Sequence, residues 1–147
     1  MRNYRVPTLT IAGSDSSGGA GVQADLKTFS AIGTYGMSVI TAVTAQNTEG
    51  VFAVEELSGE IIKSQIKAVF DDIEPAAVKI GMVSSPEIIV DIVNTIKKYN
   101  PSFLVVDPVM ISKSGYSLLK PEAKENLIKY LIPMAYLITP NVPEAEE

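Results

Sequence analysis

Cysteine, histidine and tryptophan are all absent from the 147 residues. Without cysteine the chain can form no disulfide, no thiolate nucleophile and no cysteine-based zinc site. Without histidine it can supply no Ser-His-Asp triad and no histidine-ligated metal. The chain therefore cannot form a cysteine-based or a histidine-based enzyme site from its own side chains.

Basic clusters and long apolar runs are also scarce. The chain has 12 Lys and Arg against 17 Asp and Glu, a net charge of −5, and its basic residues cluster no further than Lys97-Lys98. No run approaches the roughly 18 apolar residues of a membrane span, and Met1–Arg5 leads into a short strand without a signal-like apolar core. We therefore expect a soluble, cytoplasmic protein that binds a small molecule and neither nucleic acid nor membrane.

Hydrophobic residues make up 46% of the chain, enough for the core of one domain or part of a larger one. Short apolar runs alternate with stretches of helical spacing. Strands are predicted at 9–12, 37–45, 51–57, 77–80, 103–106 and 135–139, and helices at 22–33, 58–73, 84–96 and 121–131. This alternation predicts right-handed strand-helix-strand units and a mostly parallel sheet covered on both faces.

Local patterns refine these elements. The segment 37–45 is almost continuously apolar, as in a strand buried on both faces, whereas 51–57 has the mixed polarity of an edge or lid strand. Ser84 and Glu87 have capping-box spacing, and the loop 113–116 is predicted to be mobile. The residues predicted to face inward from two of the helices are Ile61, Ile62, Ile66, Val69, Phe70 and Ile73, and Ala123, Leu127, Ile128 and Leu131.

The glycine-rich turn Gly13–Gly21 joins the first strand to the first helix. Such glycines let backbone N–H groups approach a ligand at the positive end of a helix, although an ordinary turn explains them equally well. The phosphate-binding pattern G-x-x-x-x-G-K-[ST] is excluded because no Lys follows. Residues 19–24 fit the relaxed dinucleotide fingerprint, but they lie too far from the strand end, and the next strand ends in Gln46-Asn47 without an acid for a ribose.

Polar or glycine-rich segments follow the predicted strands, where ligands bind to sheets of this type. The segments are 13–21, 46–47, 81–82, 107–109 and 141–144. Each also has an ordinary structural explanation: Asp107 as a cap, Gln46-Asn47 as turn residues, and Asp25 as a negative charge in the first helical turn. Their shared position at one edge of the sheet favours a binding site.

Several motifs coincide with these segments. They are TIAGSDSSGGAG at 10–21, QADLKTF at 23–29, AQNT at 45–48, KIGM at 79–82, DPVM at 107–110 and ITPNVPEA at 138–145. Together and in this order they resemble the hydroxymethylpyrimidine and phosphomethylpyrimidine kinases of thiamin synthesis, which are ribokinase-like. The resemblance implies a three-layer α/β/α sandwich, with residues 1–147 as the amino-terminal part of a single kinase domain.

The resemblance also implies a reaction and a substrate pocket. The reaction is ATP-dependent phosphorylation of 4-amino-5-hydroxymethyl-2-methylpyrimidine and then of its monophosphate. Gln46 would hydrogen-bond the aminopyrimidine, because an amide can accept from the exocyclic amine and donate to a ring nitrogen. The residues that would line the pyrimidine pocket are Gly13, Ala20, Asp25, Met82 and Val109.

A second group of residues would serve the nucleotide. By the same resemblance, Asp107, Asn141 and Glu144 would lie beside the triphosphate. Asp107 and Glu144 would hold Mg²⁺ through its waters, which suits an ion that keeps much of its hydration. The implied cofactors are ATP and Mg²⁺.

The sequence departs from the family in one respect. Family members are longer, and the part without a counterpart here carries a Gly-Thr-Gly-Cys or Gly-Thr-Gly-Asp segment that supplies the catalytic residue and much of the adenine site. We therefore expect no catalytic residue in this chain and no activity from it alone. A fragment of a longer kinase, or a homodimer or higher homo-oligomer completed by another copy, would explain the difference.

Other functions remain open at this point. A pyridoxal or pyridoxine kinase shares the fold and the N-x-x-E motif, although Gln46 favours the aminopyrimidine. A non-catalytic fragment could retain only the pyrimidine pocket. The dinucleotide-binding alternative predicts affinity for NAD.

Overall fold

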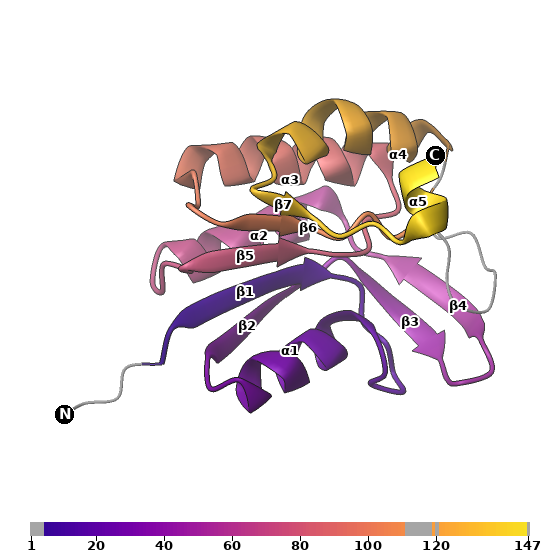
Figure 1. Ribbon diagram of the computed structural model, residues 1–147, viewed down its shortest axis with the longest axis horizontal. Helices are drawn as coiled ribbons and strands as arrows, with labels where there is room; N and C mark the ends of the chain where they lie inside the picture. Colours follow the sequence, from indigo (N-terminus) through magenta and orange to yellow (C-terminus); the bar gives the residue numbers. More distant parts are fainter. Residues whose placement is uncertain (1–4, 111–118, 120, 147) are drawn as a thin grey trace.

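Five parallel strands form the central sheet of the computed structural model, which describes residues 5–110, 119 and 121–146 (Figure 1). Their order across the sheet is β2-β1-β5-β6-β7, and every neighbouring pair is parallel. The strands are β1 (Pro7–Ala12), β2 (Tyr35–Ile40), β5 (Ala77–Ile80), β6 (Leu104–Val106) and β7 (Leu137–Ile138). The predicted α/β class with a mostly parallel sheet is confirmed.

Helices cover both faces of this sheet (Figure 1). The chain moves from β1 to β2 in one direction across the sheet and from β2 to β5, β6 and β7 in the other. Because such crossovers are right-handed, the two directions place helices on opposite faces. One face is covered by α1 (Gly21–Ala31), and the other by α2 (Gly59–Phe70), α3 (Pro86–Tyr99) and α4 (Pro121–Asn126). The remaining helical segments are η1 (Leu127–Leu131), η2 (Ile132–Met134) and α5 (Val142–Glu146).

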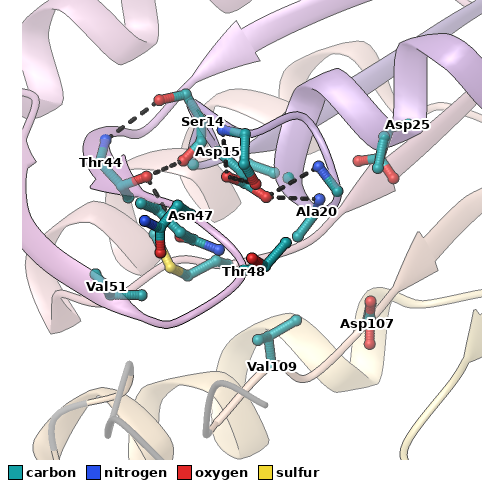
Figure 2. Close-up of a pocket in the computed structure, with 18 of the residues that line it drawn as sticks. Ser14, Asp15, Ala20, Asp25, Thr44, Asn47, Thr48, Val51, Asp107 and Val109 are labelled. Carbon is teal, nitrogen blue, oxygen red and sulfur yellow. Dashed lines mark hydrogen bonds between the residues drawn. The ribbon is translucent and has the colours of Figure 1, made fainter. Parts of the chain in front are cut away.

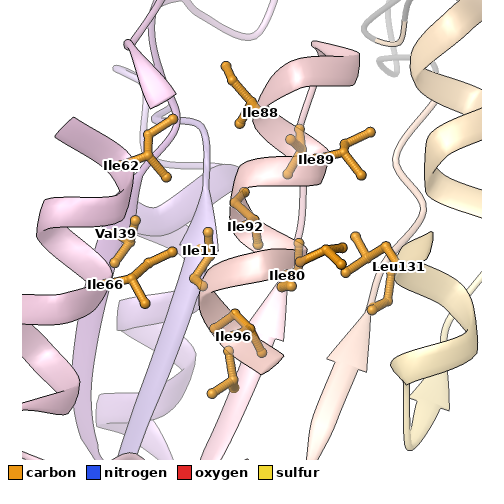
Figure 3. Close-up of a cluster of buried hydrophobic side chains, with 14 of the residues drawn as sticks. Ile11, Val39, Ile62, Ile66, Ile80, Ile88, Ile89, Ile92, Ile96 and Leu131 are labelled. Atoms are coloured by element: carbon orange, nitrogen blue, oxygen red, sulfur yellow. The ribbon is translucent and has the colours of Figure 1, made fainter. Parts of the chain in front are cut away.

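The main core lies between the sheet and helices α2 and α3 (Figure 3). Each helix begins at a serine, Ser58 or Ser85, whose side chain accepts the N–H of the residue three positions later. Fully buried isoleucines then pack onto the strands: Ile62 and Ile66 from α2, and Ile89, Ile92 and Ile96 from α3, against Ile11 and Ile80. In the described part of the chain no helix has the length and apolar character to cross a membrane.

The strand predicted at 37–45 is wrong in its extent, because the chain forms two strands there. β2 ends at Ile40 and β3 (Ala42–Gln46) pairs antiparallel with β4 (Val51–Glu56) in a separate two-stranded sheet. The Gln65 side chain accepts the Ile40 N–H and donates to the Ile40 carbonyl, which completes the backbone bonding of the strand end. β2 is an edge strand and is not buried on both faces, whereas β4 lies outside the main sheet, as an edge or lid strand would.

Thr41 is the point where the chain turns from the main sheet into the β3–β4 hairpin. Its N–H donates to the Ala12 carbonyl at 3.0 Å, its hydroxyl donates to the Met82 carbonyl at 2.9 Å, and its carbonyl accepts from Leu57 at 2.9 Å. These bonds hold the hairpin over the carboxyl ends of β1 and β5.

Smaller details of the prediction are also corrected. Ser85, not Ser84, caps α3, because the Ser84 hydroxyl donates to Glu56 at 2.7 Å. Ile128 is 46% exposed because α4 passes into the π-helical segment η1, which turns this residue away from the core. Ile61 is 47% exposed, since the buried stripe of α2 is narrower than predicted. The loop 113–116 lies outside the described residues.

Ile66→Ala should lower the free energy of unfolding by about 2–5 kcal/mol, because a fully buried side chain would leave a cavity. Ile61→Ala on the same helix is the matched control and should change it by no more than about 1 kcal/mol. Urea unfolding followed by circular dichroism measures both. Equal losses for the two variants would contradict the assignment of the core.

Candidate functional site

A cavity of about 580 Å³ lies at the carboxyl ends of the strands, within the size range of small-molecule sites. It opens beside β1 and β5, where the direction of the crossovers reverses, and this is where open parallel sheets bind ligands. All nine sequence-predicted site residues line it: Gly13, Ala20, Asp25, Gln46, Met82, Asp107, Val109, Asn141 and Glu144. Figure 2 shows Ala20 and Asp25 on one wall and Asp107 and Val109 on another.

Two glycines in the wall make close contacts, and those of Gly21 require glycine at that position. A Cβ on Gly21 would lie 2.3 Å from the Gly13 carbonyl oxygen, and Gly21 has a positive φ of 58°. A Cβ on Gly13 would lie 2.4 Å from the Met82 terminal methyl group. Gly13 and the Met82 side chain are therefore in close contact.

Asp15 holds the glycine turn together, a role that the sequence analysis does not predict. Its carboxylate is 3% exposed and accepts the N–H and hydroxyl of Ser17, each at 2.8 Å, and the N–H groups of Ala20 at 2.8 Å and Gly19 at 3.1 Å. The N–H groups of the turn just before α1 therefore already bind an anion from the chain itself. A dinucleotide would place its pyrophosphate at that helix start, so this arrangement argues against the dinucleotide fingerprint.

The ionisation of Asp15 is part of this arrangement. Burial would raise its pKa, but the hydrogen bonds from the Ser17 hydroxyl and from the Ser17, Ala20 and Gly19 N–H groups outweigh it, so the pKa lies below the usual 3.8. The charged form therefore stabilises the fold at pH values above 3.8, and this contribution is lost as the pH falls through the lowered pKa.

Gln46 lies at the end of β3, where the ladder with β4 is irregular. Ser16 fixes its backbone, because the Ser16 hydroxyl donates to the Gln46 carbonyl at 2.6 Å and accepts the Gln46 N–H at 2.8 Å. Asn47 is a turn residue, since its side-chain oxygen accepts the N–H groups of Glu49 and Gly50. Of the Gln46-Asn47 pair, only Gln46 thus has both a fixed backbone and a side chain left for the pocket.

Lys79 is the functional candidate that the sequence analysis missed. Its ammonium group lies 3.0 Å from Asp25 Oδ2 and 3.8 Å from Asp107 Oδ2, so it links one predicted pyrimidine-pocket acid to one predicted nucleotide acid. Asp25 also accepts a 2.6 Å hydrogen bond from Thr10. Asp25 is not in the first helical turn, so its explanation as a helix-start charge is wrong. The sequence feature that could have indicated a role for Lys79 is its position in a predicted strand, just before Gly81-Met82.

The acid side of the pocket carries more negative than positive charge. Burial raises the pKa of Asp107; Lys79 lowers it, and the negative charges of Glu144 and Asp25 raise it further, for a net increase. Asn141 and Glu144 form a reciprocal cap on α5: Glu144 accepts the Asn141 N–H at 3.0 Å, and the Asn141 side chain accepts the Glu144 N–H at 2.9 Å. The N-x-x-E motif therefore has a structural role whether or not it binds a ligand.

This donor set fits a hydrated Mg²⁺ ion beside phosphates. Among the described residues no three acids are grouped closely enough to hold a metal by themselves. Mg²⁺ typically takes one or two carboxylates and keeps several waters when phosphates are present. Asp107 and Glu144 supply two carboxylates whose mutual repulsion a cation would relieve.

Comparison with known proteins identifies the family of this chain. The sequence model of the phosphomethylpyrimidine kinase family matches residues 15–147. The chain belongs to this family. The hydroxymethylpyrimidine/phosphomethylpyrimidine kinase of Rhizobium meliloti (strain 1021) is 58% identical over 137 residues, which cover 93% of this chain and 51% of the relative. The chain spans about half the length of the curated relatives it matches.

Solved structures of related kinases resemble this chain in fold. The phosphomethylpyrimidine kinase from Clostridium difficile 630 superimposes with a TM-score of 0.92 at 82% identity, over 97% of this chain and 62% of that one. A pyridoxal kinase from Staphylococcus aureus, solved with AMP-PCP and pyridoxal, gives a TM-score of 0.83 at 40% identity, over 96% of this chain and 50% of that one. The three-layer kinase fold implied by the sequence motifs is thereby confirmed.

Asp15→Asn should lower the melting temperature at neutral pH, because an NH₂ group would face backbone donors at a cost of about 1–3 kcal/mol. The difference from the native chain should shrink as the pH falls below about 4 and then through the lowered pKa of the Asp15 carboxylate, where that group becomes protonated. Thermal melts across this pH range measure it, with the exposed Asp72→Asn as control. A loss for Asp15→Asn that stays constant at every pH would contradict the role of its charge.

Proposed function

We propose that residues 1–147 form the amino-terminal part of a kinase domain that phosphorylates 4-amino-5-hydroxymethyl-2-methylpyrimidine and its monophosphate in thiamin biosynthesis, with ATP as phosphoryl donor. One observation carries the proposal: an amide and two acids from distant segments, Gln46, Asp107 and Glu144, line a single cavity in a chain of this family. A cytoplasmic location and a homodimer or higher oligomer remain predictions.

The pyrimidine would bind at the glycine-turn side of the cavity. Gly13 and Met82 offer close-packed apolar surface, and Ala20 and Val109 extend it. The Gln46 amide can accept from the exocyclic amine of an aminopyrimidine and donate to the neighbouring ring nitrogen. Apolar walls with a few convergent polar groups are the usual composition of such sites.

The phosphates would lie at the acid side. Asp107 and Glu144 would hold Mg²⁺ through water, and the ion would neutralise charge on the phosphates during transfer. Lys79 keeps Asp25 and Asp107 in place by its ion pairs with both. Because phosphoryl transfer depends largely on position and charge, these residues contribute without attacking the substrate.

The 147-residue chain alone should show no turnover in a coupled ATPase assay with the hydroxymethylpyrimidine, because the Gly-Thr-Gly segment expected of the family is absent from it. Normal turnover would refute this expectation. Mixing the chain with the carboxyl-terminal half of the Clostridium difficile kinase tests the non-catalytic alternative, since restored turnover would argue against a remnant that only binds.

Gln46→Ala should weaken binding of the hydroxymethylpyrimidine about tenfold or more in calorimetry, because two hydrogen bonds to the ring are lost. Asp107→Ala is the control at the other end of the cavity and should change this affinity by no more than about twofold, since its expected effect is on the nucleotide. Equal losses for the two variants would contradict the division of the pocket. No binding to the native chain would refute the pyrimidine pocket itself.

Pyridoxal is the second candidate substrate, favoured by the likeness to the Staphylococcus aureus pyridoxal kinase. Competition between pyridoxal and the hydroxymethylpyrimidine for the native chain separates the two. We expect the pyrimidine to displace pyridoxal, because pyridoxal lacks the amine beside a ring nitrogen that Gln46 can match. Displacement in the opposite direction would favour the pyridoxal kinase.

A further inference from the structure

Thr44 is a pocket residue to which neither the family resemblance nor the proposed function assigns a role. It is 5% exposed and lies on β3, two residues before Gln46. Its hydroxyl oxygen is 2.7 Å from the Ser14 carbonyl oxygen and 3.3 Å from Gln46 Oε1. Its N–H donates to the Ser14 hydroxyl at 3.3 Å, so both its backbone and its side chain are tied to the glycine turn (Figure 2).

The Thr44 hydroxyl has one proton for two neighbouring oxygens. A hydroxyl donates once and accepts with its lone pairs, so it cannot donate to Ser14 and to Gln46 at the same time. The 2.7 Å distance to the Ser14 carbonyl is that of a strong O–H···O hydrogen bond, whereas 3.3 Å to Gln46 Oε1 is long for one. The proton therefore belongs to the Ser14 bond, and lone pairs of the Thr44 oxygen face Gln46.

A lone pair at this place favours the NH₂ group of Gln46 over its oxygen. A half-turn of the amide exchanges its oxygen and nitrogen at nearly the same positions, and the NH₂ group can then donate to Thr44. The Gln46 backbone stays where it is, because Ser16 binds both its N–H and its carbonyl. Only the direction of the amide changes.

We propose that Thr44 sets the direction of the Gln46 amide, and thereby the order of donor and acceptor that a bound ring must present. This inference rests on the proposed pyrimidine pocket and identifies Thr44 as a positioning residue for specificity. One Gln46 N–H is held by Thr44, the other is left for a ring nitrogen, and the Gln46 oxygen accepts from an exocyclic amine. A 4-oxo ring, with a carbonyl beside a ring N–H, needs the opposite direction.

Calorimetry with two rings tests the proposal. The probes are 4-amino-5-hydroxymethyl-2-methylpyrimidine and its 4-oxo counterpart, and the readout is the ratio of their affinities. Thr44→Val keeps the shape but removes the hydroxyl, and it should reduce the preference for the amino ring by about fivefold, the effect of one hydrogen bond. Thr44→Ser keeps the hydroxyl and should retain the native preference. A ratio unchanged in Thr44→Val would overturn the proposal.

The ratio separates specificity from stability. Thr44→Val also leaves the Ser14 carbonyl without its hydroxyl donor. A lower melting temperature therefore reflects the loss of the Ser14 bond and does not measure the direction of the amide. If Thr44→Val loses affinity equally for both rings, Thr44 supports the wall without directing the amide, and the proposal fails. If the native chain binds neither ring, the proposed pyrimidine pocket fails and this inference fails with it.

A second measurement needs no ligand. Nuclear magnetic resonance of the native chain should show a nuclear Overhauser effect between the Gln46 side-chain NH₂ protons and the Thr44 methyl protons. Thr44→Ser lacks that methyl group and identifies the signal. The absence of the effect in a folded native chain would overturn the amide direction while leaving the pyrimidine pocket itself untouched, so the two proposals can fail separately.

Discussion

The Asp15 carboxylate is the interaction on which the rest of the pocket depends. Four donors from the turn 17–20 converge on it, and they fix the loop that carries Ser14 and Ser16. Those two serines in turn hold Thr44 and the Gln46 backbone of the neighbouring hairpin. A buried charge would be costly if it lacked partners, and here its partners are the same backbone groups that shape the binding wall. The stability of the turn and the shape of the pocket therefore depend on one set of hydrogen bonds.

The pocket has two chemically different ends, and Lys79 lies between them. The glycine-turn end offers close-packed apolar surface and one amide, whereas the other end gathers Asp107 and Glu144. Lys79 pairs with Asp25 and approaches Asp107, so a single cation compensates part of the charge on both. Burial raises the pKa of Asp107, and the negative charges of Glu144 and Asp25 raise it further, so this end of the pocket is receptive to a cation.

Most of the fold could be predicted from the sequence because apolar periodicity reports burial directly. The strand-end rule selected segments that contain eight of the nine predicted site residues, since the carboxyl ends of parallel strands meet at one edge. The ninth, Asp25, was implied by the family resemblance and also lines the cavity. Whether these residues bind the ligands assigned to them stays a prediction. The break between β2 and β3 was missed because it depends on Gln65, which lies 25 residues away in the chain and has no local signature.

Lys79 and Asp15 were missed for a related reason. An alternating strand pattern does not tell which acids a lysine will meet, and a carboxylate within a glycine turn is easily taken as a turn residue. Their roles arise from contacts between β5 and α1 and from the closure of the turn on itself. The Lys79–Asp25 contact joins residues 54 positions apart, so it exists only where β5 and α1 lie side by side.

The β3–β4 hairpin carries Gln46 on a sheet of its own, separate from the five strands whose ends carry Asp107 and Glu144. Under the proposed function, recognition of the ring and binding of the phosphates would therefore involve two different sheets. These sheets are connected at Thr41 and through the bonds of the hairpin to Ser14 and Ser16. If the proposed pocket is correct, substitutions on the exposed side of the hairpin would alter which heterocycle fits while the strand ends that carry Asp107 and Glu144 keep their places. An architecture divided in this way would allow a change of substrate to be separated from a change in the chemistry at the acid end.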